Sequence, residues 1–277
     1  MARLSIVIVA YNSRRDLDAC LSSLTTHRAH IDTDVIVVDN ASLDGTVDHV
    51  RARWPGVRLI EAGGNLGFAK ANNLAIRQTS SELVLLLNPD TIVPAGAIDA
   101  LVNVLDRQPH VAIVGPRLVD GEGRAELSFG RMISPFTELR QKILVRGNDR
   151  GVRVVQRLVE RMTRVDRRVD WVSGACLLVR RTDLEAVGLL DERFFMYTED
   201  VDLCAQVRAR GRHVAFAPEA TVVHLRGRSV ASAADATRRA YRRSQIAFYE
   251  KHHPGWAPLL RLYLKITGGS PDRPNKP

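Results

Sequence analysis

Cysteine is scarce in this chain of 277 residues, which contains only Cys20, Cys176 and Cys204. The number is odd and no pair has the CxxC spacing, which argues against a disulfide scaffold and a structural zinc site. The chain also lacks a run of about 18 apolar residues, the length that a membrane-spanning helix needs. The short apolar run near the N-terminus is typical of a strand rather than of a signal peptide. We therefore expect a cytoplasmic protein, either soluble or peripheral to a membrane.

Lysine is also rare, because five of the 40 basic residues are lysine and the other 35 are arginine. The net charge is +9. Arginine can bind a planar phosphate group through two parallel hydrogen bonds. The positive charge therefore fits nucleic acid, anionic lipid or a polyphosphate substrate as a partner, although genomic codon bias would produce the same composition. The remaining composition, 45% apolar and 26% charged, is that of a globular protein with a substantial core.

The first half of the chain alternates between β-branched apolar runs and amphipathic stretches. The apolar runs, at residues 4–12, 34–40, 57–62, 82–88 and 111–119, predict buried strands with helices between most of them. Strands that alternate with helices indicate βαβ units and a largely parallel sheet in the α/β class. In such sheets, ligands bind beyond the carboxyl ends of the strands.

The second half is more basic and more helical. Residues 138–168 predict one or two amphipathic helices, 171–181 a strand, 197–211 a helix, and 213–225 one or two short strands. Ten basic residues lie between Arg140 and Arg168, and seven lie between Arg238 and Lys265 among five aromatic residues. Basic residues mixed with aromatic ones suit an anionic membrane surface. The alternatives are ordinary solvated helix faces and contacts between two copies of the chain.

Two aspartates follow directly on predicted strands. Asp39 follows the run "VIVV", where its carboxylate can accept a hydrogen bond from a nucleobase or ribose, or cap the next helix. Asp90 stands in the turn "NPDT" beside Asn88, where a carboxylate can present Mg²⁺ or Mn²⁺ to a diphosphate. A plain Asn-Pro-Asp turn is the alternative there.

The glycine-containing segment "GGNLGFAKANN" at residues 63–73 follows the third predicted strand. It has neither the GxGxxG pattern nor the Walker lysine, so as a phosphate-binding signal it is weak. The segment "AYNSRRD" after the first strand contains no glycine. This absence argues against a NAD-binding Rossmann protein and against a nucleotidyltransferase.

Two further constellations contain ionisable residues. Glu199 and Asp200 are adjacent acids behind an aromatic segment, and apolar surroundings would raise their proton affinity as a general base requires. The alternative is that they only complement a helix dipole, with Thr198 as the N-cap. His224 ends a predicted strand, and Arg226 follows it; the histidine can complete a metal site or be purely structural, while the arginine can bind phosphate.

The order of these segments resembles that of the family 2 glycosyltransferases, and most closely the bacterial rhamnosyltransferase-like branch. The segments are "SIVIVAYN", "VIVVDNASLDGT", "NLGFAKANN", "LLLNPD", "GACLLVRR", "FFMYTEDVDLC" and "HLRGRS", within residues 3–230. The resemblance implies a GT-A fold of Rossmann type, with a mostly parallel sheet flanked by helices. It implies one domain at 1–230, with a nucleotide-sugar half (1–117) and an acceptor half (118–230). Beyond the resemblance, the basic and aromatic residues 231–268 predict a helical C-terminal extension, and the proline-rich, polar residues 269–277 predict a disordered tail.

The resemblance also assigns roles. Asp39 would contact the nucleotide base, Asp90 and His224 would bind the metal, and Asp200 would be the catalytic base with Glu199 beside it. The other residues predicted to bind the nucleotide sugar are Ala10, Tyr11, Asn12, Asn65, Gly67, Lys70, Asn88 and Arg226. Asn88 departs from the DxD motif, which often has aspartate there, so an inactive homologue that still binds nucleotide sugars stays an alternative. Asp39 and Asp90 would hold the two ends of the donor across adjacent strand ends.

The resemblance further implies an inverting enzyme that uses Mg²⁺ or Mn²⁺ and a nucleotide-diphospho-sugar, with dTDP-rhamnose favoured over UDP-sugars. The acceptor would be a hydroxyl of a cell-envelope glycan or of a polyprenyl-diphosphate-linked sugar. The basic and aromatic segments, rather than the resemblance, indicate an anionic membrane surface and a second copy of the chain as possible further partners. A basic nucleic-acid-binding protein is the remaining alternative, but it leaves the acids at the strand ends unexplained.

Overall fold

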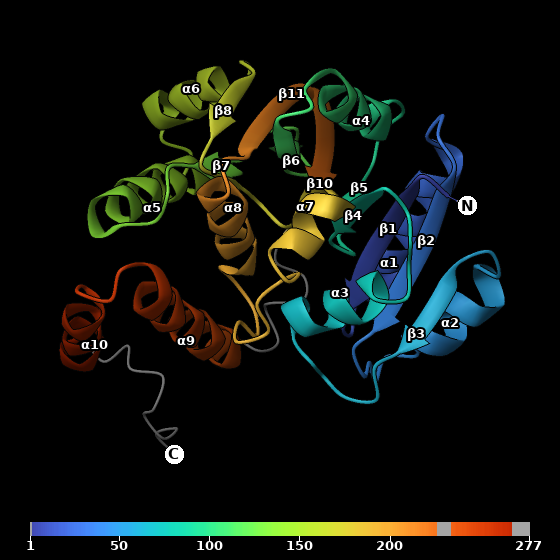
Figure 1. The fold of residues 1–277 in the computed structure, drawn as a ribbon, viewed down its shortest axis with the longest axis horizontal. Helices are drawn as coiled ribbons and strands as arrows, with labels where there is room; N and C mark the ends of the chain where they lie inside the picture. Colours follow the sequence, from blue (N-terminus) through green and yellow to red (C-terminus); the bar gives the residue numbers. More distant parts are fainter. Residues whose placement is uncertain (1, 226–233, 268–277) are drawn as a thin grey trace.

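The computed structural model describes residues 2–225 and 234–267. Arg226, one of the predicted phosphate-binding residues, lies outside the described residues, as does the tail predicted to be disordered. Figure 1 shows a central sheet with helices on both faces and two further helices from the C-terminal part at one side.

The strands are β1 (Leu4–Ala10), β2 (Thr33–Asp39), β3 (Arg58–Glu61), β4 (Leu83–Leu87), β5 (Thr91–Ile92), β6 (Val111–Val119), β7 (Phe129–Gly130), β8 (Arg167–Val169), β9 (Trp171–Val172), β10 (Cys176–Arg180) and β11 (His213–His224). The helices are α1 (Arg14–Thr26), α2 (Thr46–Arg53), α3 (Phe68–Ile76), α4 (Ala97–Arg107), α5 (Pro135–Asp149), α6 (Arg153–Met162), α7 (Arg181–Ala186), α8 (Glu199–Ala209), α9 (Ala234–His252) and α10 (Ala257–Ile266). The strand–helix alternation predicted for the first half is therefore present.

The main sheet has the strand order β3-β2-β1-β4-β10-β6-β11-β5, and β8 pairs with β11. The first four strands in this order are parallel, as are β6 and β11, whereas β10 runs antiparallel between β4 and β6. This confirms an α/β fold with a mostly parallel sheet. The division of the first 230 residues into a nucleotide-sugar half and an acceptor half stays a prediction.

One predicted strand is divided in two. Residues 171–181 were expected to form a single strand, but β9 pairs with β7 in a separate two-stranded sheet and β10 enters the main sheet. The residues between them turn the chain, and Gly174 lies at that point against Asp200, where an added Cβ would be only 3.2 Å from the aspartate Cβ. The turn that separates β9 from β10 is therefore part of the candidate site.

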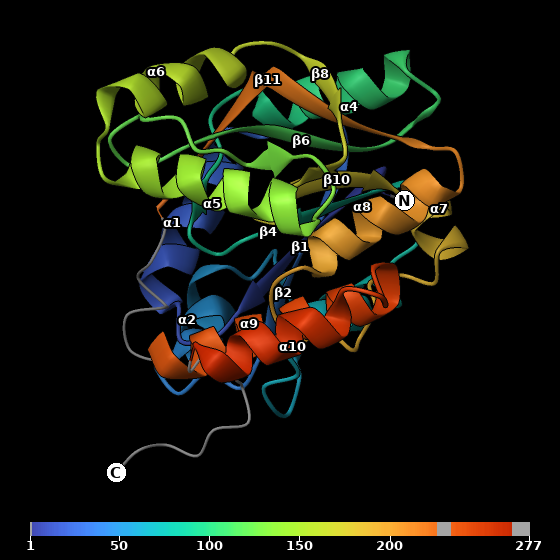
Figure 2. The same ribbon diagram turned by 90° about the vertical axis from the view of Figure 1, so that its left-hand side faces the viewer.

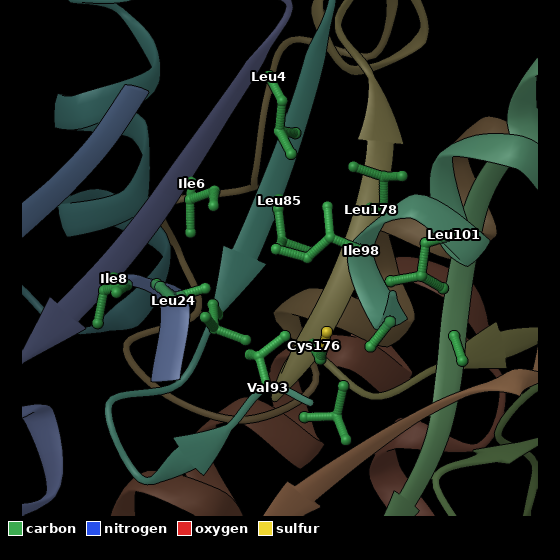
Figure 3. Packing of buried hydrophobic residues seen from close by; sticks show 14 of the residues in the cluster. Leu4, Ile6, Ile8, Leu24, Leu85, Val93, Ile98, Leu101, Cys176 and Leu178 are labelled. Atoms are coloured by element: carbon green, nitrogen blue, oxygen red, sulfur yellow. The ribbon is translucent and has the colours of Figure 1, made fainter. Parts of the chain in front are cut away.

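The strands are apolar on both faces because helices cover both sides. Leu4, Ile6 and Ile8 of β1 pack on the side of α1 and α4, as Figure 3 shows for this cluster. Val7 and Val9, the alternate residues of the same strand, pack on the side of α3 and α8. Successive side chains of a strand point to opposite faces, so a parallel sheet buried on both sides needs a continuous apolar run.

The C-terminal helices pack against α5 and α8 around a small separate cluster that contains Phe194, Val201, Phe248 and Tyr249. This confirms the predicted helical extension. None of the helices in residues 2–225 and 234–267 has both the length and the apolar composition that crossing a membrane would require.

Candidate active site

The carboxyl ends of β1, β2 and β4 meet at one edge of the sheet. Ala10 lies opposite Asp39, and Ile8 lies opposite Leu87, the last residue of β4. The predicted placement of Asp39 and Asp90 beyond strand ends is therefore correct. The two strands are not adjacent, however, because β1 lies between them. Two strand spacings, about 10 Å, separate β2 from β4, a length suited to the distance between a nucleoside and its diphosphate.

Asp39 is a buried carboxylate at the end of β2, with only 3% of the residue exposed. Its Oδ2 accepts a hydrogen bond of 3.0 Å from the backbone N–H of Ser42. Its Oδ1 is buried and has no hydrogen-bond partner among the described residues. An acceptor left unpaired in the interior costs about 1–3 kcal/mol, so this oxygen suits a donor group that arrives with a ligand, such as a nucleobase N–H.

A network of asparagines joins the three loops around Asp39. Asn12 accepts a 2.7 Å hydrogen bond from the N–H of Leu43, so it ties the first loop to the second. The Nδ2 of Asn40 donates to Asn65 over 3.0 Å, and its Oδ1 accepts from the N–H of Leu66. Ala10 fixes Asn40 in turn through a backbone hydrogen bond of 2.8 Å.

The remaining predicted nucleotide-sugar residues lie around this network. The ring of Tyr11 is 44% exposed, directly after β1. Lys70 is exposed on the first turn of α3. Gly67 has a φ of +80°, and an added Cβ would lie 2.3 Å from the carbonyl oxygen of Phe195. Only glycine fits both conditions, so Gly67 lets its loop contact the segment that leads to Asp200.

Asp90 and His224 lie side by side because β5 pairs with the end of β11. His224 is the register partner of Thr91, and the backbone of Leu225 donates to the carbonyl of Asp90 over 2.8 Å. This pairing places the His224 Nε2 3.4 Å from the Asp90 Oδ1. The Nδ1 of His224 lies 3.2 Å from the Oε2 of Glu126, which is 5% exposed.

The two carboxylates set the charge of the histidine. Burial by itself lowers the pKa of His224, but the hydrogen bonds with Asp90 and Glu126 outweigh it and raise the pKa to about 9. In the protein alone, the imidazole is therefore protonated at neutral pH and bridges the two acids. A partner on the second ring nitrogen is the usual way in which a metal-ligating histidine is oriented.

Asp90 and His224 could hold a divalent cation of the Mg²⁺ or Mn²⁺ type, provided that the cation displaces the Nε2 proton of the protonated imidazole. Two ligands of one such cation lie about 3 Å apart, because each metal–ligand bond is about 2.1 Å long, and the Asp90 and His224 atoms are at 3.4 Å. Across residues 2–225 and 234–267, no group of three or more His, Cys, Asp or Glu side chains is arranged to hold a metal ion. These cations usually take one or two protein ligands and complete their shell with water and phosphate oxygens, so a two-residue site suffices.

Asn88 has a structural role through its backbone. Its N–H donates to the carbonyl of Ala175 over 2.9 Å, and its carbonyl accepts from the hydroxyl of Thr91 over 2.7 Å. These bonds fix the turn that carries Asp90. The side chain is partly exposed at the edge of the sheet, where its role toward the ribose or the metal stays a prediction.

Asp200 lies in the first turn of α8, and its carboxylate is held by two backbone amides. The N–H of Gly174 donates to Oδ2 over 2.7 Å, and the N–H of Val201 donates to Oδ1 over 2.8 Å. Burial raises the pKa of Asp200, and these hydrogen bonds oppose the rise. The segment Ser173–Ala175 therefore connects the two predicted centres, because Ala175 contacts the Asp90 turn and Gly174 contacts Asp200.

Glu199 is more deeply buried than its neighbour, with 6% of the residue exposed. Its Oε2 has no hydrogen-bond partner among the described residues. Burial and the negative charge of Asp200 raise the pKa of Glu199 well above its ordinary value. The folded protein therefore holds the Glu199 proton more tightly than the unfolded chain does. Thr198 occupies the N-cap position as expected, but its side chain makes no capping hydrogen bond.

Backbone strain is concentrated around the same loops. Among the residues that the structure describes, five other than glycine have positive φ, and four of them lie in the candidate site: Asn12, Ala41, Tyr197 and Thr198. Each such residue costs about 1–3 kcal/mol, so the surrounding contacts must impose these conformations. Tyr197 and Thr198 directly precede α8 and set the direction in which Asp200 enters the site.

Comparison with known proteins identifies this arrangement. A family model described as "Glycosyltransferase like family 2" matches residues 2–245 of the chain. The chain belongs to the family 2 glycosyltransferases. The match spans every predicted site residue, and it confirms the family expected from the order of the sequence motifs.

Two characterised relatives resemble this glycosyltransferase over nearly its whole length. An N-acetylglucosaminyl-diphospho-decaprenol L-rhamnosyltransferase of Mycobacterium tuberculosis is 34% identical over 271 residues, covering 92% of the chain and 87% of the relative. A dTDP-rhamnosyl transferase of Shigella flexneri is 27% identical over 273 residues, covering 94% of the chain and 83% of the relative.

The fold has a solved counterpart. A mannosyltransferase from Pyrobaculum calidifontis, in complex with GDP-Man and Mn²⁺, superimposes with a TM-score of 0.62 and 20% identity. The match covers 94% of this glycosyltransferase and 68% of the mannosyltransferase. This likeness confirms the GT-A fold.

Three residues of the glycosyltransferase site escaped the sequence analysis. Asn40 directly follows Asp39, and its place in the same strand-end turn could have marked it as a site residue. Gly174 interrupts an otherwise apolar run, which typically marks a close backbone contact. Glu126 gave no usable signal, because its proximity to His224 depends on pairing between segments that are 98 residues apart.

The raised pKa of Glu199 predicts how a Glu199→Gln variant of the glycosyltransferase will respond to pH. The native state holds the Glu199 proton more tightly than the unfolded state, so the wild type loses stability as the pH rises from about 4 toward the raised pKa. Glutamine has nearly the same shape and cannot ionise. We expect Glu199→Gln to have a higher melting temperature than the wild type at pH 7, and the same one below about pH 4.

Thermal melts across this pH range test the expectation. Glu219→Gln is the matched control, because Glu219 is exposed and should show no pH-dependent difference from the wild type. A melting temperature of Glu199→Gln equal to or below that of the wild type at pH 7 would contradict the raised pKa of the buried Glu199.

Proposed function

We propose that this glycosyltransferase is an inverting, metal-dependent rhamnosyltransferase that uses dTDP-rhamnose. Its acceptor is the hydroxyl of a polyprenyl-diphosphate-linked sugar in the synthesis of a cell-envelope glycan. The observation that carries the proposal is the similarity to the Mycobacterium tuberculosis rhamnosyltransferase, whose name specifies an L-rhamnosyl group and an N-acetylglucosaminyl-diphospho-decaprenol acceptor. The geometry supports it, because one edge of the sheet offers a nucleoside contact, a cation pair and a base.

The donor is held at both ends. Asp39 accepts a hydrogen bond from the base through its unpaired Oδ1, and the loops fixed by Asn12, Asn40 and Asn65 surround the ribose. Asp90 and His224 would hold Mg²⁺ or Mn²⁺ at the diphosphate, about two strand spacings away. When bound, the cation would act as a Lewis acid that offsets the charge on the leaving diphosphate.

The transfer itself is a single displacement. The acceptor hydroxyl oxygen attacks the anomeric carbon from the face opposite the diphosphate, and a new C–O bond forms as the bond to the diphosphate oxygen breaks. The hydroxyl proton passes to the carboxylate of Asp200, and dTDP leaves with the electron pair. Both Asp200 oxygens are fixed by backbone N–H groups, so the base is positioned before the acceptor arrives.

A donor screen by thermal shift tests the proposal. A ligand stabilises a protein in proportion to the logarithm of its concentration over its dissociation constant. We expect dTDP-rhamnose with Mn²⁺ or Mg²⁺ to raise the melting temperature more than dTDP-glucose, which differs only in the sugar, and EDTA to abolish most of the shift. No shift with any nucleotide sugar would favour an inactive homologue.

A UDP-sugar donor is the second candidate, because Asp39 contacts a feature that thymine and uracil share. The ring N–H of both bases can donate to the Asp39 Oδ1. A larger shift with UDP-sugars than with dTDP-rhamnose would keep the reaction class and replace the donor.

A further inference from the structure

The exposed side of α5 is unusually apolar for a surface helix. Phe136 is 76% exposed, Leu139 60% and Ile143 59%. Their spacing of three and four residues aligns them in one stripe along the helix. Isolated apolar residues on a surface are ordinary, but an aligned stripe is typical of a surface that contacts something.

Helix α10 has a second stripe of this kind. Leu259, Leu262 and Ile266 are 55%, 55% and 75% exposed, whereas Leu264 on the opposite side of the helix is buried at 1%. Tyr263, at 58% exposure, lies next to the stripe. The helix is therefore apolar on its exposed side as well as on the side that packs against the protein.

The two helices that carry these stripes lie on the same side of the molecule. The rings of Phe136 and Trp256 meet edge to face, with 6.5 Å between centroids, where α5 and α10 begin. Figure 2 shows both helices on the side that faces the viewer, and the same side is seen in profile at the left of Figure 1. We call the exposed residues Phe136, Leu139, Ile143, Leu259, Leu262 and Ile266 the α5–α10 surface.

Arginines border this surface. Arg140 and Arg146 are exposed on the same side of α5 as Leu139 and Ile143, and Arg150 is exposed directly after the helix. The acid Glu138 of that helix is turned inward, where Lys142, Gln245 and Tyr249 bind it. Glu250 pairs with Arg261, and Asp149 is the exposed acid at the end of α5. The exposed face of α5 therefore has more positive than negative charge.

We propose that the α5–α10 surface binds the headgroup region of an anionic bilayer. Leucine, isoleucine and aromatic side chains would enter the boundary between headgroups and acyl chains, and the arginines would meet lipid phosphates. The arginines beside the stripe favour lipid phosphates over a second copy of this chain, because a second copy would bring arginines of the same charge against them. The inference rests on the proposed function for its purpose, since a polyprenyl-linked acceptor lies in a membrane.

The surface is connected to the candidate base by polar contacts. Ser244 of α9 donates to the carbonyl of Met196 over 2.7 Å, in the segment before α8. Lys251 and His252 bind Asp202, a fully buried residue of α8, over 2.9 Å and 2.6 Å. Helix α10 follows α9 directly. Membrane binding would therefore fix the position of Asp200 relative to the bilayer, as an acceptor with its lipid in the membrane requires.

Vesicle flotation of the full chain tests the proposal. One set of vesicles contains phosphatidylglycerol and phosphatidylcholine, and the other contains phosphatidylcholine alone. We expect binding to the first set and little to the second. Arg140→Gln/Arg146→Gln should weaken partitioning roughly 25-fold, from about fivefold for each arginine, which corresponds to ~1 kcal/mol. Arg28→Gln/Arg107→Gln removes two exposed arginines elsewhere and should leave partitioning unchanged.

A second pair of double variants tests the apolar residues of the α5–α10 surface. Leu139→Gln/Ile143→Gln should weaken partitioning at least tenfold, whereas Leu139→Met/Ile143→Met should preserve it. Melting temperatures verify that every variant is folded. Equal flotation of the wild type, Arg140→Gln/Arg146→Gln and Leu139→Gln/Ile143→Gln would overturn the proposal. So would a wild-type dimer that Leu139→Gln/Ile143→Gln makes monomeric without vesicles, since the surface would then join two copies.

The donor screen separates this inference from the proposed function. Nucleotide-sugar shifts measured without vesicles should be the same for the wild type and all the α5–α10 variants. Flotation as expected without any nucleotide-sugar shift would retain the membrane surface and remove the proposed reaction. A nucleotide-sugar shift without flotation would retain the proposed reaction and remove the membrane surface.

Discussion

Replacing Asp200 with asparagine should slow glycosyl transfer by about 10²–10⁴-fold, the usual contribution of a general base. Donor affinity should change little, because the nucleoside and the diphosphate are held at Asp39 and at the Asp90–His224 pair. Turnover with saturating donor and acceptor measures the first effect, and the donor-induced thermal shift measures the second. Normal turnover by the variant would rule out Asp200 as the base.

The hydrogen bonds of Asp200 determine how this experiment is controlled. Both oxygens accept from backbone N–H groups, and an asparagine side chain can accept only one of these bonds well. The unpaired N–H costs about 1–3 kcal/mol, so turnover is measured well below the melting temperature of the variant. Glu192→Gln is the matched control, because it also removes a hydrogen-bonded carboxylate from the segment before α8 and should retain turnover.

The pH profile gives an independent signature of the base. Asp200 must be deprotonated to accept the proton, so the wild-type rate should rise with pH as the group titrates. Burial raises the pKa of Asp200, against the opposing effect of the two hydrogen bonds, so the rise should occur above the range of an ordinary aspartate. The residual activity of Asp200→Asn should lack this rise.

Replacing Asp90 with alanine should remove the metal dependence of donor binding. The variant loses the carboxylate that would bind the cation, and a cation at a diphosphate contributes several kcal/mol. We therefore expect donor affinity in Mn²⁺ to fall roughly 100-fold or more and to become insensitive to EDTA. Titration calorimetry with dTDP-rhamnose in Mn²⁺ and in EDTA measures both quantities.

Two comparisons show whether the loss of donor affinity in Asp90→Ala results from the loss of the metal ion. Binding of dTMP should persist in Asp90→Ala, because the nucleoside contact at Asp39 is about 10 Å away, whereas Asp39→Asn should weaken both dTMP and donor. Glu126→Gln leaves both candidate ligands in place and should weaken metal affinity about 10–100-fold, as loss of a partner of a metal-bound histidine does. An EDTA-sensitive donor interaction retained by Asp90→Ala would exclude Asp90 as a ligand.

The sheet and its functional edge were predictable from local patterns. The continuous apolar runs that end in Asp39 and Asn88 indicate strands buried on both faces, and ligands bind at the carboxyl ends of such strands. The helix that contains Asp200 and the strand that ends in His224 were also predicted correctly, because each has a local pattern of its own. The single strand expected at residues 171–181 was wrong, because a local pattern does not show that Gly174 turns the chain at the Asp200 carboxylate.

The sequence by itself determined the class of sheet, the family and the acids and histidine most suited to the chemistry, because periodicity and strand-end polarity are properties of short segments. Only the tertiary structure decided which of these residues meet. The pairing of β5 with β11 places His224 against Asp90, and β1 separates β2 from β4. The positions of Glu126 and Gly174 and of the two helices that carry the apolar stripes also depend on contacts between distant segments. Such contacts follow from the packing of the whole chain, so no local pattern specifies them.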